Sequence, residues 1–177
     1  EGTPRWSDDQ IAERIAAVGG EFVTDVGFDD TTIDWAVLKQ DLAPALEVLA
    51  EVVQRPVFPQ AVVERERTAV LAERHANSEH PPETVFLRAL FGDGPYGGSG
   101  SGETKSLTHI VQEDVARFHR QAYRPDHVIL AAAGEITFTE FAALATQYFG
   151  DWSVTEKGEN TPTAFSGKTS PTAVVVD

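Results

Sequence analysis

Two glutamates on one predicted helix have the type and spacing that metal chemistry would use. Glu66 and Glu73 fall within a charged stretch that predicts a helix over about 60–77. Residues seven apart lie two turns along a helix with little angular drift, so both carboxylates share a face. One carboxylate on such a face is a suitable zinc ligand, and the second could steady it or a bound water. The alternative interpretation is a solvated helix whose Glu and Arg side chains pair along it.

A zinc site needs more ligands than these two, and the histidines do not supply them. His75 and His80 are five residues apart, so on a helix they point roughly 140° away from each other and cannot close on one ion. Pro81 and Pro82 also end regular helix at that point. Three other histidines lack a partner at ligand spacing: His109, His119 and His127.

Other catalytic chemistries find no support in the sequence. The chain has no Cys, which excludes thiolate catalysis and thiolate metal sites, and it has no Gly-x-Ser-x-Gly elbow. The glycine-rich stretch 92–102 lacks the Gly-Lys-Ser/Thr ending of a phosphate-binding loop, and no strand precedes it. Its glycines are therefore expected to serve sharp turns, with Tyr96 packed beneath them.

The elements that would position these residues predict an α+β fold, an antiparallel sheet flanked by helices. Ser7 and Gln10 form a capping-box pattern before a helix that Gly19 and Gly20 end, and Asp41 is a candidate N-cap for a helix to about 53. Segments 22–28 and 32–38 predict an antiparallel pair of strands, with Ile33 and Trp35 on one face. The remaining predictions are helices over 82–91, 111–123 and 139–149, a buried strand over 128–133, and inward positions for Leu90 and Phe118.

Amino-acid composition limits the compartments and the binding partners that this chain can have. The 177 residues hold 14 Lys and Arg against 28 Asp and Glu, a net charge of −14 that opposes binding to nucleic acid or anionic membranes. No apolar run is long enough to span a bilayer and no secretory signal opens the chain. We expect a soluble protein, with periplasm and cytoplasm both open. The absence of Met, even at the start, predicts a chain whose beginning has been cut away.

Composition also changes along the chain and predicts its organisation. Residues 1–152 carry the periodic apolar patterns of one α+β domain, which we expect to be truncated at its N-terminus. Residues 153–171 are rich in Thr, Ser, Gly and Pro without periodicity and predict a linker. Residues 172–177 then predict the first strand of a following domain.

A series of short blocks, in a fixed order, carries a resemblance to a known family. The blocks are Glu1-Gly-Thr-Pro-Arg-Trp-Ser7, Val18-Gly-Gly20, Thr31-Thr-Ile33, Val37-Leu38, Asp41-Leu42, Arg55-Pro-Val-Phe58, the acidic helix through Glu73, Gly94-Pro-Tyr-Gly97, Ser101-Gly102, Phe118-His119, Tyr123-Arg-Pro125, Gly134-Glu135 and Tyr148-Phe-Gly-Asp-Trp152. Over residues 1 to about 152 the chain resembles the insulinase/pitrilysin family of zinc peptidases, which includes the mitochondrial processing peptidases.

The resemblance implies particular roles for the two glutamates. The family's defining His-x-x-Glu-His helix should lie just upstream of Glu1 and is absent from this sequence. In a catalytic-type half, Glu73 would be the third zinc ligand and Glu66 a supporting carboxylate. Zinc is thus the family's cofactor, but we expect this chain alone to bind none and to be inactive.

Three functions follow from the resemblance. The favoured one is a non-catalytic half that helps a homologous catalytic half or subunit to enclose a peptide substrate, because Glu1-Gly-Thr3 and Gly94-Pro-Tyr-Gly97 are closer to that type. The alternatives are a catalytic half that supplies Glu73 to zinc for peptide hydrolysis, and a structural core-type subunit without proteolysis. Because the family works as paired halves, an isolated domain is expected to expose an apolar surface, which would also allow a homodimer.

Overall fold

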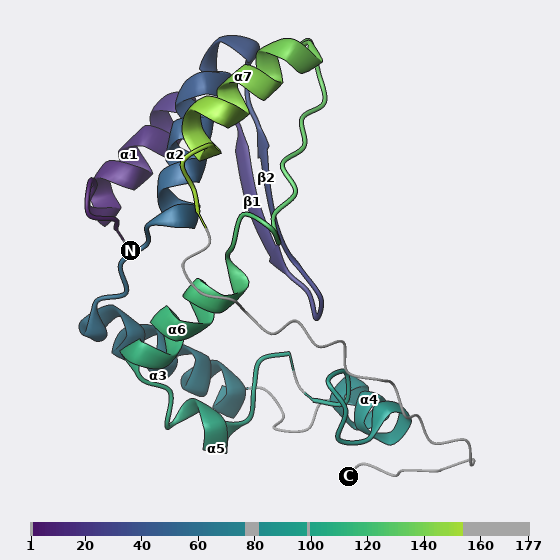
Figure 1. Cartoon of the computed structure of the whole chain (residues 1–177). Helices are drawn as coiled ribbons and strands as arrows, with labels where there is room; N and C mark the ends of the chain where they lie inside the picture. The colour runs from purple at the N-terminus through teal and green to yellow at the C-terminus, as the bar shows by residue number, and fades with distance from the viewer. Residues whose placement is uncertain (1, 77–81, 99, 154–177) are drawn as a thin grey trace. The chain divides into compact units, whose positions relative to one another are not determined.

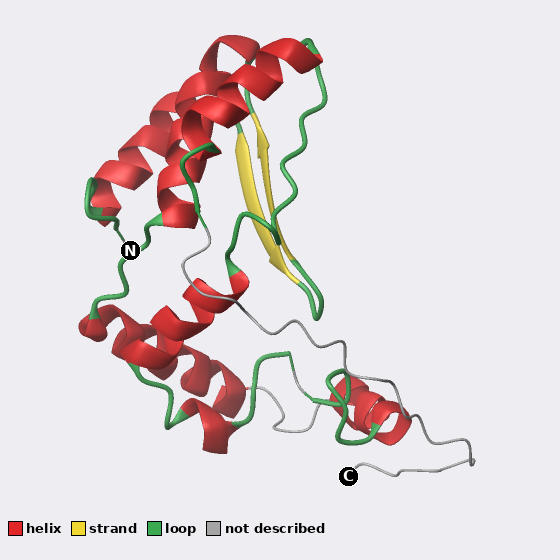
Figure 2. Ribbon diagram, viewed as in Figure 1, coloured by secondary structure: helices red, strands yellow, loops and turns green. Residues whose placement is uncertain are grey.

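The computed structural model describes residues 2–76, 82–98 and 100–153, which divide into two compact units. The first unit contains residues 2–25, 31–60 and 112–153, and the second contains residues 26–30 and 61–111. The helices and strands confirm the predicted α+β class (Figure 2). None of the described helices combines the length and apolar character needed to cross a membrane.

The first unit is a layer of helices beside a two-stranded antiparallel sheet (Figure 1). Its elements are α1 (Asp8–Val18), β1 (Glu21–Val26), β2 (Thr31–Ala36), the 3-10 turn η1 (Lys39–Asp41), α2 (Leu42–Gln54), α6 (Gln112–Ala122) and α7 (Phe138–Phe149). Helix α2 packs against both α1 and α7, so it is the centre of the helical layer. Its buried residues include Leu46 and Val48.

The core of this unit forms where the chain enters α1 and meets α2. Trp6, Ile11 and Val48 are buried together, and Trp35 of β2 packs against them. Trp35 also makes an edge-to-face contact with Phe22, at 5.1 Å between ring centroids. Its indole Nε1 donates to the Gly19 carbonyl at 2.9 Å, which joins the sheet to the end of α1.

Local signals read from the sequence explain how α1 begins and ends. Ser7 Oγ accepts from the Gln10 amide, and the Gln10 side chain accepts from the Ser7 amide, so the predicted capping box is confirmed. Gly19 and Gly20 both take positive φ. At Gly20 a Cβ atom would lie 1.8 Å from the Ala36 carbonyl oxygen, so only glycine fits where the chain turns back beside β2.

Four predictions for individual segments are wrong. Residues 128–133 form a loop, with Ile129 93% exposed, instead of a buried strand. An apolar strand is stable only when a neighbouring strand satisfies its backbone, and the described sheet contains only β1 and β2. Phe118 and Leu90, which were expected to point inward, are 64% and 41% exposed. Asp41 precedes α2, but its side chain makes no capping hydrogen bond.

The second unit holds α3 (Gln60–Ala76, whose first residue belongs to the first unit), α4 (Pro82–Phe91) and the short α5 (Thr104–Leu107). Tyr96 packs against two aromatic rings: its ring lies 5.6 Å from Phe91 and 5.7 Å from Phe28, between ring centroids. The Tyr96 hydroxyl donates to Asp29 at 2.7 Å. This carboxylate contact raises the pKa of Tyr96. Arg88 of α4 pairs with Asp93 and Glu103, which fixes the glycine-rich loop between α4 and α5.

Candidate functional site on helix α3

Helix α3 holds both candidate carboxylates on solvent-facing positions. Val63 and Val70 are half-buried, whereas Glu66 and Glu73 are exposed. The helix therefore presents an apolar side for packing and an acidic side for solvent or a ligand, as its spacing predicted. No residue described within α3 is fully buried.

Glu66 is held by a neighbouring arginine. Arg65 Nε and Nη2 donate to Glu66 Oε1 at 3.0 and 2.9 Å, and the Glu66 side chain is 53% exposed. An exposed ion pair of this kind contributes about 0–1 kcal/mol to stability. The Arg65 contact neutralises Glu66 locally, so the repulsion expected between two carboxylates on one face is reduced.

Glu73 has a different environment. It is exposed, and within residues 2–76, 82–98 and 100–153 it makes no hydrogen bond and no ion pair. The nearby His75 does not turn toward it, because His75 Nδ1 lies 2.7 Å from the Leu71 carbonyl oxygen of the same helix. His80, the other histidine of the misleading pair, lies outside the described residues.

A second arginine of α3, Arg67, ties the helix to the segment that follows α5. Arg67 is only partly exposed, pairs with Glu64 one turn earlier, and donates from Nη1 to the Ile110 carbonyl oxygen at 2.9 Å. The charged stretch therefore also has a structural role, because one of its arginines donates a hydrogen bond to a backbone carbonyl.

The described residues do not fit a zinc ion by themselves. A protein zinc site uses three or four His, Cys, Asp or Glu ligands in tetrahedral arrangement. Across the part of the chain that the structure describes, no three such side chains are gathered. Glu66 is engaged by Arg65, and Glu73 has no second ligand beside it within residues 2–76, 82–98 and 100–153. We therefore derive no chemical step through zinc from these residues.

His119, which the sequence marked only weakly, has a structural environment in the first unit. Its Nε2 lies 2.8 Å from the Val53 carbonyl oxygen, its ring stacks on Tyr123 at 4.8 Å between ring centroids, and Phe58 lies at 5.6 Å. Burial lowers the pKa of His119, although the carbonyl contact acts in the opposite direction. The ring therefore joins α6 to the end of α2 in its neutral form. In the sequence, the signal for this stacking was the four-residue spacing between His119 and Tyr123.

Arg124 is a buried polar residue that the sequence did not reveal. Its side chain is 8% exposed, and Nε and Nη2 donate to the two oxygens of Asp126. This pairing lowers the pKa of Asp126. The third guanidinium nitrogen, Nη1, is buried and has no hydrogen-bond partner among the described residues.

Comparison with known proteins decides the family. Residues 1–95 match the sequence model described as Insulinase (Peptidase family M16), which is more than half of the chain. The chain belongs to the M16 peptidase family. Residues 109–176 match the M16 model described as the inactive domain. The resemblance read from the short blocks is thereby confirmed.

Relatives within the M16 family support the same conclusion. The chain is 33% identical over 151 residues to an uncharacterized zinc protease of Mycobacterium tuberculosis, covering 84% of this chain and 34% of that protein. It is 29% identical over 161 residues to the beta subunit of human mitochondrial-processing peptidase, covering 89% and 33%. The chain thus spans about a third of the length of these curated relatives.

Solved structures show that the fold is shared. A protease from Helicobacter pylori matches with a TM-score of 0.84 at 17% identity, over 95% of this chain and 41% of that chain. An M16 inactive domain from Pseudomonas fluorescens matches with a TM-score of 0.80 at 23% identity, over 94% and 41%. At these identities the matches establish the fold alone.

Proposed function

We propose that this chain is part of the non-catalytic half of an M16 zinc protease and helps to enclose a peptide substrate. The observation that carries the proposal is the state of the acidic face of α3. Glu66 is engaged by Arg65, and the described part of the chain places no second metal ligand beside Glu73. The match of residues 109–176 to the M16 inactive domain supports the same role.

The proposed partner is a homologous half that carries the zinc site. The names of two similar proteins imply a second part: the beta subunit of human mitochondrial-processing peptidase, and the first half of the periplasmic protease PqqL of Escherichia coli. In the proposed assembly this chain forms part of the surface that encloses the peptide. The partner supplies the metal, the water that attacks the peptide carbonyl, and the general base. The peptide lies between them.

A second candidate is the catalytic half itself. It is favoured by the exposure of Glu73 and by the zinc protease names of the relatives. In that case Glu73 would complete a zinc site whose histidines and general base come from residues outside this sequence. Glu66, held by Arg65, would then be the supporting carboxylate that orients a ligand.

One comparison separates the two candidates. Peptidase activity and bound zinc are measured for the complete polypeptide that carries these residues, together with its partner, as wild type and as Glu73→Gln. Glu13→Gln is the matched control, because Glu13 is also an exposed glutamate on a helix. The non-catalytic role predicts that both variants keep wild-type activity and zinc. Loss of both in Glu73→Gln, with Glu13→Gln unchanged, would establish the catalytic role instead.

A further inference from the structure

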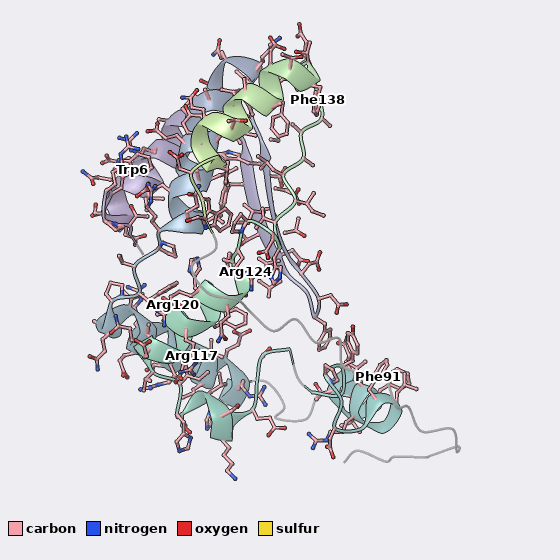
Figure 3. All side chains as sticks on the ribbon, in the orientation of Figure 1. Trp6, Phe91, Arg117, Arg120, Arg124 and Phe138 are labelled. Carbon is pink, nitrogen blue, oxygen red and sulfur yellow. The ribbon has the colours of Figure 1, made fainter. Side chains whose placement is uncertain are left out.

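We draw no further inference here: the strongest candidate, the exposed apolar surface patch of the link 128–133, which follows Arg124 just past the C-terminal end of α6 (Figure 3), carries nothing, because nothing in the structure shows what covers it.

Discussion

At the residue scale, the two glutamates of α3 share a face and differ in their contacts. Glu66 has an arginine partner, whereas Glu73 is exposed on a helix whose described residues are at most half-buried. Spacing alone predicted that they share a face, because helical periodicity is independent of tertiary structure. The Arg65 contact was not predictable in the same way, since neighbouring side chains on a helix usually diverge and the pair depends on rotamer choice.

Replacing Glu73 with Gln should change the free energy of unfolding by no more than about 0.5 kcal/mol, as for other surface sites. The reason is that Glu73 is exposed and the described residues offer it no ion pair to lose. Urea unfolding of wild type and variant measures the difference. A loss of several times this size would show that Glu73 contributes to packing or to an organised charge network.

His119 should make stability depend on pH in the range where histidine titrates. Burial lowers the pKa of His119 in the folded chain. The contribution of His119 to the free energy of unfolding is therefore fully present above its pKa in the unfolded chain, about 6.5. The contribution is lost as pH falls from that value through the folded pKa, because the unfolded chain then binds the proton more readily. Urea unfolding at about pH 8 and about pH 5 measures the change.

The matched variants for this prediction are His119→Gln and His109→Gln. Carboxylates also titrate toward acid, so the relevant quantity is the difference between wild type and each variant. His119→Gln should show a weaker loss of stability on acidification than wild type. His109→Gln, at an exposed position, should follow wild type. Parallel curves for all three proteins would exclude His119 as the titrating group.

At the element scale, helix α2 organises the first unit through its contacts with α1 and α7. Two side-chain contacts to backbone carbonyls reinforce it. Gln54 Nε2 donates to the Tyr148 carbonyl at the end of α7, and His119 reaches the Val53 carbonyl from α6. The last turn of α2 is therefore held from two directions by residues distant in sequence.

Leu46→Ala should destabilise the chain by about 2–5 kcal/mol, because the side chain lies in the packed face of α2 and leaves a cavity. Leu46 is 3% exposed, whereas Leu38, just before η1, is 67% exposed. Leu38→Ala is thus the matched control and should stay within about 0.5 kcal/mol of wild type. Equal losses for the two variants in urea unfolding would contradict the placement of the core on α2.

Sequence reasoning worked best for elements whose signals are local. The capping box of Ser7 and Gln10, the stop at Gly19 and Gly20, and the paired strands all depend on residues a few positions apart. It failed for the link 128–133 and for the orientation of Phe118. In both cases the apolar pattern assumed a covering neighbour, and burial depends on which segments are present to pack, not on the pattern itself.

At the scale of the whole molecule, the chain is an M16-family α+β protein that spans about a third of the length of its curated relatives. It has a net charge of −14 and several exposed large apolar side chains: Val26, Phe28, Leu38, Phe86, Phe118, Ile129 and Phe138. Charge keeps such a chain dispersed, whereas the apolar residues are of the type that a partner surface would cover.

The zinc content of the complete polypeptide that carries these 177 residues, purified apart from any partner, tests the central claim most directly. The protein is purified without chelator, supplied with zinc, dialysed against metal-free buffer, and its zinc per chain is measured by elemental mass spectrometry. A non-catalytic half should retain no stoichiometric zinc, because Glu66 is held by Arg65 and no second ligand lies beside Glu73 among the described residues. One zinc retained per chain, and lost again in Glu73→Gln, would contradict the account and identify Glu73 as a metal ligand.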